Sequence, residues 1–367
     1  MKIVTFGEIM GRLTPPGFLR LRQTLPGSLD VTFAGAEANV AASLAMLFSS
    51  NDKITSTFVS ALPANPLGDA CVASLRALGV DTQHIVQRES GRLGLYFVET
   101  GANQRPSQVL YDREGSTISQ TGSEHYDWNQ IFADASWLHI TGITPAISAA
   151  AAESTLAAAS EAKQRGLSVS CDLNFRKKLW NWQPEIPAQA LAQQTMRKIL
   201  PNVDLVIANE EDCSDVLEIQ ATNTDVQAGK LAIDRYPDVA RQLIEQFPNV
   251  NRVGITLRES QSASHNNWGA MLFEAEHNQA CFAPLEDGQY APYPIRNIVD
   301  RVGGGDAFAA GLIYSLVTED QASGSAAIRF AAAASCLAHS IVGDFNFSTL
   351  NDIQTLMAGS TSGRVVR

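Results

Sequence analysis

The chain carries the segment DRVGGGDAFAAGLIY at Asp300–Tyr314, in which three glycines and an aspartate lead into good helix formers. A helix N-terminus presents unpaired backbone N–H groups, and glycines before it let a ligand approach closely. Gly303, Gly304 and Gly305 therefore predict an anion cradle suited to phosphate. A resting phosphate would repel Asp306, so we expect a hydroxyl between them, whose proton Asp306 accepts during phosphoryl transfer. The alternative is that Asp306 only caps the helix.

Short apolar runs alternate with helical runs through most of the chain. The predicted strands are Ile3–Glu8, Thr57–Leu62, Trp137–Ile143, Ser168–Asn174, Leu205–Asn209 and Val253–Leu257. The predicted helices between them are Ala36–Phe48, Pro66–Leu78, Ile147–Arg165, Ala188–Ile199 and Val239–Gln246. This order predicts an α/β fold with a central, mostly parallel sheet and helices on both faces. The carboxyl ends of the strands then share one edge, where such sheets bind ligands.

Two regions interrupt this alternation, Gly11–Gly35 and Gly91–Ile118. The second places two β-rich runs around the turn-like GANQRPS, which predicts a hairpin. We expect both regions to lack helices and to form a small β-sheet lid inserted in one domain that spans residues 1–367. The polar stretch Gln220–Asp234 is interpreted as a surface insertion.

The composition excludes several classes of function. A formal charge of −11 disfavours binding to nucleic acid or to an anionic membrane, and no apolar run approaches the length of a membrane span. Five scattered cysteines without a C-x-x-C pair argue against disulfides and a zinc site. We therefore expect a soluble, cytoplasmic protein. Neither a G-x-x-x-x-G-K-[ST] motif nor a G-x-G-x-x-G after the first strand is present, so any nucleotide needs another cradle.

The hairpin region suggests a substrate-facing surface. Tyr111 and Arg113 are two residues apart and face one side of their predicted strand, and Tyr96 in the partner strand can share that side. The alternative is an ordinary exposed hairpin face with a surface arginine.

A second polar group follows another strand. Asp172, Asn174 and Arg176 alternate at its carboxyl end and could converge on the ligand edge, whereas Lys177 and Lys178 are expected to be solvated. Arg113 and Arg176 could together clamp a carboxylate through bidentate hydrogen bonds. A neutral sugar would not need that pair, so the sequence favours a sugar acid.

The segments GAEANVAASLA (Gly35–Ala45) and DRVGGGDAFAAG (Asp300–Gly311) resemble the two signatures of the ribokinase-like, or PfkB, carbohydrate kinases. The pieces FGEIMGRLTPP, GLYFVE, VLYDRE, CDLNFRKKLW and ANEED are similar to the 2-keto-3-deoxygluconate kinases of that family, in the expected order. The resemblance implies a ribokinase-like fold with a β lid, which the alternation of elements predicts independently. It also implies ATP and Mg²⁺ as cofactors, and a homodimer that pairs through the lid strands.

The resemblance also implies roles for individual residues. Asp306 falls on the catalytic base and Gly303–Gly305 on the anion hole. The substrate-binding positions are Gly35, Asn39, Tyr96, Tyr111, Arg113, Ile143 and Arg176; the nucleotide-binding positions are Asn174, Asn209, Thr256, Gly303 and Gly305; Asp212 would contact the metal through water. For Gly35 and Asn39 the alternative is a strand end and a polar residue early in a helix.

The chain departs from the family pattern at four places. Arg301 stands where the family usually has Thr, and Gly304 where it has Ala. The family's Thr-x-Gly-x-x-Gly nucleotide loop appears as ITLRES at Ile255–Ser260, and the Glu of its Asn-x-x-Glu motif is the shorter Asp212. Three functions stay open at this point: a kinase for 2-keto-3-deoxygluconate, a kinase of the same fold for a neutral ketose such as fructose or for a nucleoside, and a carbohydrate-sensing module without turnover.

Overall fold

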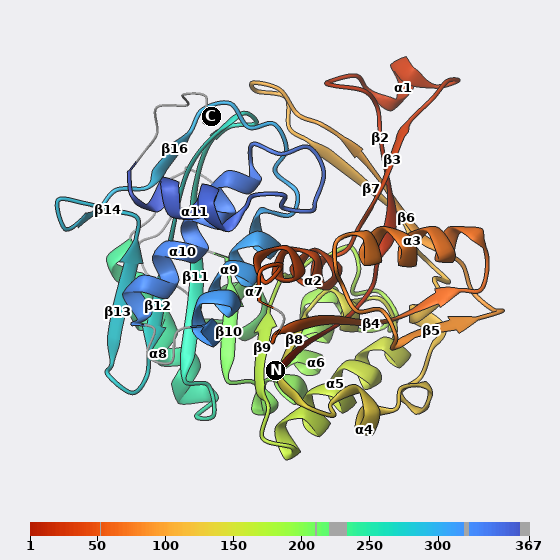
Figure 1. Cartoon of the computed structure of the whole chain (residues 1–367), viewed down its shortest axis with the longest axis horizontal. Helices are drawn as coiled ribbons and strands as arrows, with labels where there is room; N and C mark the ends of the chain where they lie inside the picture. The colour runs from red at the N-terminus through yellow and green to blue at the C-terminus, as the bar shows by residue number, and fades with distance from the viewer. Residues whose placement is uncertain (52, 210, 220–232, 319–322, 360–367) are drawn as a thin grey trace.

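A large sheet organises the chain in the computed structural model, which describes residues 1–51, 53–209, 211–219, 233–318 and 323–359 (Figure 1). We call it the main sheet. Its strand order is β13-β12-β11-β10-β9-β8-β1-β4-β5, with β16 paired to β12. The parallel strands are β1 (Lys2–Phe6), β4 (Thr55–Pro63), β5 (Ile85–Arg88), β8 (Ala135–Thr141), β9 (Ser168–Asp172), β10 (Leu205–Ala208) and β11 (Arg252–Ser262). The antiparallel strands are β12 (His265–Glu274), β13 (Gln279–Ala283) and β16 (Tyr293–Ile295).

Helices cover both faces of the main sheet, as the continuous apolar strands predicted. Residues of α2 (Ala36–Leu47), α9 (Gly304–Thr318) and α10 (Gly324–Ala338) pack with Ile3 on one face. Residues of α5 (Ala149–Gln164), α6 (Ala188–Ile199), α7 (Asp212–Leu217) and α8 (Tyr236–Gln246) pack with Val4 on the other. Adjacent residues of β1 thus point to opposite layers, because side chains alternate along a strand.

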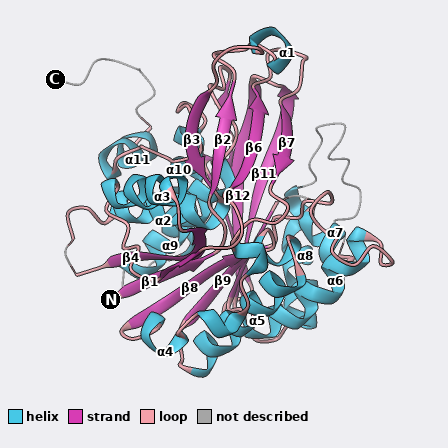
Figure 2. Cartoon of the chain, turned by 90° about the vertical axis from the view of Figure 1, so that its right-hand side faces the viewer, coloured by secondary structure: helices cyan, strands magenta, loops and turns pink. Residues whose placement is uncertain are grey.

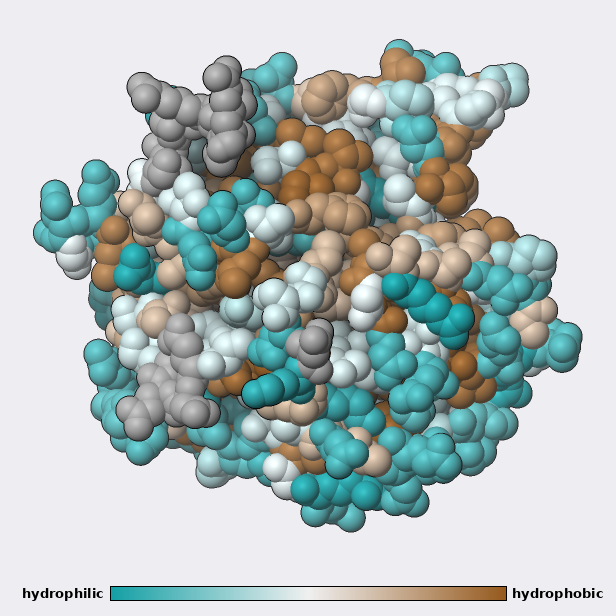
Figure 3. All heavy atoms as spheres, viewed as in Figure 1, coloured by the Kyte–Doolittle hydropathy of each residue, from teal (hydrophilic) through white to brown (hydrophobic). Residues whose placement is uncertain are grey.

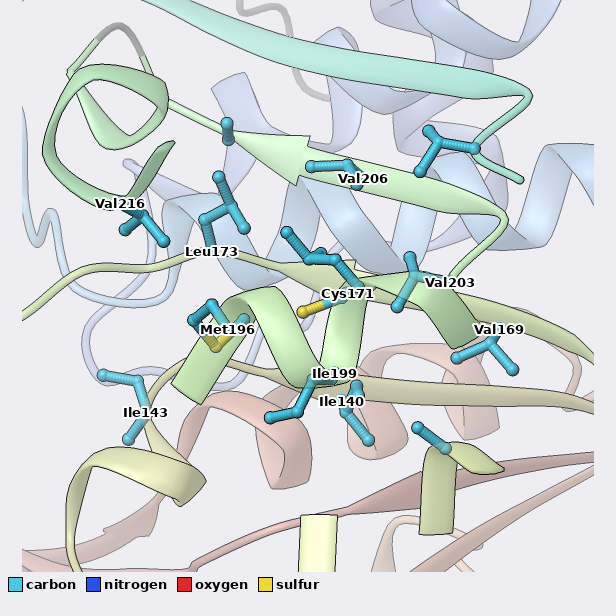
Figure 4. Close-up of a cluster of buried hydrophobic side chains, with 14 of the residues drawn as sticks. Ile140, Ile143, Val169, Cys171, Leu173, Met196, Ile199, Val203, Val206 and Val216 are labelled. Carbon is cyan, nitrogen blue, oxygen red and sulfur yellow. The ribbon is translucent and has the colours of Figure 1, made fainter. Parts of the chain in front are cut away.

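The core on the second face combines aliphatic and aromatic side chains. Figure 4 shows Ile140 and Val169 from β8 and β9, Val206 from β10, and Met196 and Ile199 from α6 in one buried cluster. Each buried side chain of this size contributes about 1.5–3 kcal/mol. This packing fixes the carboxyl ends of β8, β9 and β10 relative to one another.

A second sheet of four strands stands beside the main sheet (Figure 2), and we call it the small sheet. Its order is β3-β2-β6-β7, from β2 (Met10–Thr14), β3 (Asp30–Ala34), β6 (Gly94–Glu99) and β7 (Gln108–Asp112). Apart from Met10, which begins β2, these strands lie inside the two regions predicted to form it, and β6 and β7 form the predicted hairpin. Figure 3 shows hydrophobic residues gathered on the upper half of the view, where the small sheet lies, and a mostly hydrophilic lower half.

Some expectations need correction. The region Gly11–Gly35 does contain a helix, the single turn α1 (Leu21–Thr24), which Gln23 helps to close by accepting the N–H of Arg20. The sequence prediction also missed β12 and β13. β12 pairs antiparallel with β11 and β13 pairs antiparallel with β12, which breaks the alternation of parallel strands and helices. Most of the stretch Gln220–Asp234 lies outside the described residues.

The remaining elements are short or peripheral. They are α3 (Pro66–Ala77), α4 (Trp128–Ile131), α11 (Leu350–Met357), β14 (Leu285–Glu286), β15 (Gln289–Tyr290) and the 3₁₀ turns Ile118–Gln120, Ser123–His125, Thr144–Ala146, Leu200–Asn202 and Ile233–Arg235. Among the described residues, no helix is both long and apolar enough to cross a bilayer.

Candidate active site

A cavity of about 320 Å³ is lined by residues of both sheets. They come from the small sheet, from the segment that follows β8, from the carboxyl ends of β9 and β10 and the segments that follow them, from β11 and β12, and from the N-termini of α2 and α9. The predicted site residues that line it are Gly35, Asn39, Tyr96, Tyr111, Arg113, Ile143, Asn174, Arg176, Asn209, Asp212, Thr256, Gly303, Gly305 and Asp306. Gly304 is the one predicted site residue outside this lining. The fold therefore brings together predicted site residues that lie up to 271 positions apart in sequence, from Gly35 to Asp306.

Asp306 lies inside the first turn of α9, as the third residue of the helix. The carbonyl of Gly303 already accepts the N–H of Ala307, so Asp306 is not the helix cap and that alternative is wrong. Its Oδ2 accepts a 2.6 Å hydrogen bond from Asn39 Nδ2. Burial raises the pKa of Asp306 to about 7, and this bond opposes the rise. A carboxylate with a pKa near neutrality suits a general base.

The glycines before Asp306 each meet a different environment. Gly303 has φ +86°, and a Cβ there would lie 2.3 Å from the carbonyl oxygen of Asp344. Only glycine fits this turn. A Cβ on Gly304 would lie 3.0 Å from the His339 ring. A Cβ on Gly305 would meet nothing within 4 Å, so this glycine borders open space at the helix N-terminus.

One face of the small sheet forms a wall of the cavity. Cross-strand pairing sets Arg12, Tyr96 and Tyr111 in one row across β2, β6 and β7. The rings of Tyr96 and Tyr111 are 6.4 Å apart, and the Arg113 guanidinium lies 5.6 Å from the centre of the Tyr111 ring. Arg113 is only 6% exposed, so the alternative of a surface arginine on an open hairpin is wrong.

Arg113 forms a buried ion pair with Glu8, which the sequence reasoning treated only as the end of a strand. Its Nε atom is buried and has no hydrogen-bond partner. A buried N–H donor without a partner costs about 1–3 kcal/mol, so the site favours an acceptor in the cavity. Arg176 is exposed, and its Nη1 donates to the carbonyl of Phe175.

Two carboxylates organise the segments after β9 and β10, and Asp212 links the two segments to each other. Asp172 Oδ1 accepts the N–H of Asn174, whose φ of +36° turns the chain at the strand end. Asp212 Oδ1 accepts the N–H of Phe175, and its Oδ2 accepts the N–H of Asn209. Burial raises the pKa of both Asp172 and Asp212. Asp212 therefore fixes the loop geometry and has only its remaining lone pairs for a metal-bound water.

No group of three or more acidic, histidine or cysteine side chains in the described part of the chain is placed to hold a metal ion.

A basic and aromatic wall closes the other end of the cavity. Thr256 and Arg258 project from one face of β11, and Trp268 is paired with Arg258 across the ladder. The Trp268 ring lies 4.7 Å from the His339 ring, centroid to centroid, at an interplanar angle of 60°. Arg301 also lines the cavity, and its Nη2 donates to the carbonyls of Ser262 and Ala263 at the β11–β12 turn. Sequence reasoning missed Asn266, Trp268 and His339 as site residues. The only signal for Asn266 and Trp268 was the alternation along HNNWGAM in an unpredicted strand, and His339 follows α10 with no local signal.

Arg12, Asp300 and Asp344 were also missed, and they form a buried network at the edge of the cavity. Arg12 donates to both carboxylates, and Tyr96 Oη donates to Asp344 Oδ2 at 2.8 Å. The partners of Arg12 lie 288 and 332 residues away in sequence, and no local pattern marks them.

Known proteins resemble this chain along nearly its whole length. A model of the pfkB family of carbohydrate kinases matches residues 1–244 and 270–347. The structure of 2-dehydro-3-deoxygluconokinase from Thermotoga maritima is 43% identical, covers 98% of this chain and 100% of its own, and superposes with a TM-score of 0.85. The 2-dehydro-3-deoxygalactonokinase of Haloferax volcanii is 28% identical over 362 residues, which are 99% of this chain and 98% of its own.

A more distant relative shares the fold. The structure of a putative ribokinase II from E. coli, solved with ATP and Mg²⁺, is 20% identical, covers 98% of this chain and 99% of its own, and has a TM-score of 0.74.

Proposed function

The chain belongs to the pfkB family of carbohydrate kinases, and we propose that it transfers the γ-phosphoryl group of ATP to a hydroxyl of 2-keto-3-deoxygluconate or a close relative of that sugar acid. The observation that carries the choice of substrate is the presence of Arg113 and Arg176 in the same cavity as Asp306. A guanidinium binds a carboxylate with two parallel hydrogen bonds, which a neutral sugar cannot match.

Arg113 keeps donors for the substrate although Glu8 already takes one of its nitrogens. Its buried, unpartnered Nε lies on a side chain that lines the cavity, and Tyr111 shields the guanidinium from water. Arg176 adds a second positive charge from the main body. Two cations from opposite parts of the fold would hold the carboxylate only when the small sheet lies over the site.

The chemistry that we propose is an in-line transfer. Asp306 accepts the hydroxyl proton as the sugar oxygen bonds to the γ-phosphorus, and the bond from that phosphorus to the β,γ-bridging oxygen breaks, which releases ADP. The N–H groups at the start of α9, at Gly303 and Gly305, face the charge that develops on the transferred group. Asn39 orients the Asp306 carboxylate through their hydrogen bond.

The nucleotide would lie along the basic wall. Thr256, Asn209 and Asn174 are the predicted contacts, and we add Arg258 and Arg301, which stand where the family pattern has Gly and Thr. Guanidinium groups can replace main-chain donors at a polyphosphate. Mg²⁺ would neutralise charge on the phosphates, with Asp212 reached through water.

The small sheet serves as the lid of a single kinase domain of residues 1–367 in this proposal. Closure over the sugar would exclude water, which otherwise competes with the hydroxyl for the phosphoryl group.

We also propose that two chains pair through their small sheets. Val31, Leu13, Phe97 and Leu110 form one cross-strand row on the face opposite the Arg12 row. Val31 is 63% exposed and Leu110 60% exposed, and each lies on an edge strand. Exposed apolar edges of this kind favour association with another sheet.

A reducing, cytoplasmic location is part of the same proposal. The five cysteines all lie in described parts of the chain, and each is a free thiol. Free thiols persist where glutathione and thioredoxin keep cysteines reduced.

A coupled assay of ADP release tests the proposed function. The panel contains 2-keto-3-deoxygluconate, its galactonate epimer, fructose and adenosine, each with ATP and Mg²⁺. We expect kcat/KM for one or both sugar acids to exceed that for fructose and adenosine at least a hundredfold. Preference for fructose would instead identify a neutral-ketose kinase, preference for adenosine a nucleoside kinase, and no turnover with any of them a binding module.

A further inference from the structure

Arg12 connects the small sheet to the main body from a fully buried position. It projects from β2 in the row that faces the cavity and is 2% exposed. Its Nη1 donates to Asp344, and its Nη2 donates to Asp300. Asp300 precedes α9 and Asp344 follows α10, so one guanidinium joins three segments that are distant in sequence.

Asp300 shapes the start of the glycine segment. Its Oδ1 accepts the N–H of Arg301 at 2.8 Å and the N–H of Val302 at 3.2 Å. Its Oδ2, which Arg12 also contacts, accepts the N–H of Gly343 at 3.2 Å. The carboxylate that receives Arg12 therefore also determines how the backbone enters Gly303.

Asp344 contacts the same segment from the other side. Its carbonyl oxygen packs so closely on Gly303 that a Cβ there would lie 2.3 Å away. Its carboxylate accepts hydrogen bonds from Arg12 and Tyr96, both of the small sheet. If the small sheet moves and takes Asp344 with it, the backbone contact between Asp344 and Gly303 changes as well.

We propose that Arg12 is a positioning residue for phosphoryl transfer, which acts through Asp300 and Asp344 to set the geometry of Gly303–Gly305 when the small sheet is closed. The inference rests on the proposed kinase function and extends it, because it links closure to assembly of the anion-binding segment. Without the guanidinium, two buried carboxylates would face each other uncompensated. The arrangement of residues 303–305 is therefore energetically favourable only when the small sheet lies in place and Arg12 pairs with Asp300 and Asp344.

A second attachment acts on the neighbouring residue. The N–H of Ala263 donates to the carbonyl of Asn103 in the β6–β7 loop at 2.7 Å, and Arg301 Nη2 donates to the carbonyls of Ser262 and Ala263. Figure 1 shows these two loops side by side at the top of the view. Consecutive residues, Asp300 and Arg301, are thus both connected to the small sheet.

Steady-state kinetics of Arg12→Met and Arg12→Lys test the role. Arg20→Gln is the matched control, because Arg20 pairs with Glu99 within the region of the small sheet and does not reach the main body. We expect kcat of Arg12→Met to fall at least tenfold, with KM for sugar acid and ATP changed less than threefold, because misplaced groups slow the transfer step. ADP should also form in excess over sugar phosphate. Arg12→Lys keeps the positive charge but lacks the planar guanidinium that reaches both carboxylates, so its kcat should fall at least threefold. This variant provides the test if Arg12→Met does not fold. Arg20→Gln should stay within twofold of wild type.

Hydrogen exchange gives a readout that does not depend on turnover. In Arg12→Met or Arg12→Lys, peptides that cover β2 and residues 300–305 should both lose protection, whereas in Arg20→Gln residues 300–305 should keep it. The proposal is overturned if kcat of the Arg12 variants stays within twofold of wild type, or if kcat of Arg20→Gln falls as much as theirs. It is also overturned if residues 300–305 keep their protection from exchange in the Arg12 variants. Wild-type protein that phosphorylates no substrate would contradict the proposed function, while the exchange measurement would still decide the coupling.

Discussion

Asn39 and Asp306 are joined by a 2.6 Å hydrogen bond between the first turns of α2 and α9. The bond joins two signature segments of the sequence and orients the Asp306 carboxylate, whose pKa burial raises to about 7. Hydrogen bonds to a carboxylate favour its charged form. The pair therefore holds a base that titrates near neutral pH.

Replacing Asp306 by Asn should remove the base and keep the shape of the site. We expect kcat to fall about 10²–10⁴-fold, the range for loss of general base catalysis, with KM nearly unchanged. Asp69→Asn is a control, since Asp69 is an exposed acid in the first turn of α3. Turnover of Asp306→Asn within threefold of wild type would remove Asp306 from the mechanism.

The rate should depend on pH through the same group. Because the base form is required, kcat/KM should fall about tenfold per unit below pH 7 and level off above it. Asn39→Ala removes a hydrogen bond that lowers the pKa, so its acid limb should move to higher pH. An acid limb that does not move would mean that another group controls it.

The raised pKa also predicts a stability effect. Between the ordinary value of 3.8 and about 7 the folded state holds a proton that the unfolded state has released, so this contribution to stability is lost as pH rises. Chemical denaturation at several pH values should therefore give a larger drop from pH 4 to 7 for wild type than for Asp306→Asn. The difference is at most about 4 kcal/mol, at about 1.4 kcal/mol per pKa unit.

Arg176→Ala should damage use of the sugar acid without damaging the fold. Arg176 is exposed and has one hydrogen bond to a neighbouring carbonyl, so the free energy of unfolding should change by less than about 0.5 kcal/mol. Loss of a charged hydrogen bond, about 1.5–3 kcal/mol, should raise KM for the acid about 10–100-fold. Lys177→Ala, at an exposed neighbouring residue, is the control. An equal rise in KM for the acid in this variant would mean that general positive charge, and not a specific contact of Arg176, binds the substrate.

Gly303→Ala should strain the backbone and also create a steric clash, whereas Gly166→Ala should only strain the backbone. Both glycines have positive φ, +86° and +77°, but a Cβ on Gly166 would meet nothing within 4 Å. For Gly166→Ala the free energy of unfolding should therefore fall by only about 1–2 kcal/mol, with full activity kept. Gly303→Ala should lose more stability and most of its kcat, because the Cβ displaces Asp344 from the anion-binding segment. Equal losses in both variants would contradict this.

Leu110→Glu places a charge on the exposed apolar row of the small sheet. If two chains pair through this face, light scattering should show a dimer for wild type and a monomer for the variant. Glu276→Ala, an exposed change far from that row in sequence, should leave the dimer intact. A wild-type monomer at micromolar concentration would contradict the proposed pairing.

The sequence by itself determined the local elements and the edge where the site lies. Apolar strand runs such as Leu205–Asn209 and the glycines before Asp306 are local signals, since periodicity and backbone freedom act over a few residues. Even there a boundary differs: β9 ends at Asp172, two residues before the predicted end at Asn174, and Asn174 turns the chain into the site.

Only the tertiary structure decided which side chains meet. The antiparallel β12 pairs with β11 between residues 3 to 22 apart in sequence, such as Ser262 with His265 and Arg252 with Glu274. The pairing of Arg113 with Glu8 and the contacts of Arg12 with Asp300 and Asp344 join residues 105 to 332 apart. Such contacts arise from packing and from the need of each buried charge for a partner, and neither leaves a trace in local residue order.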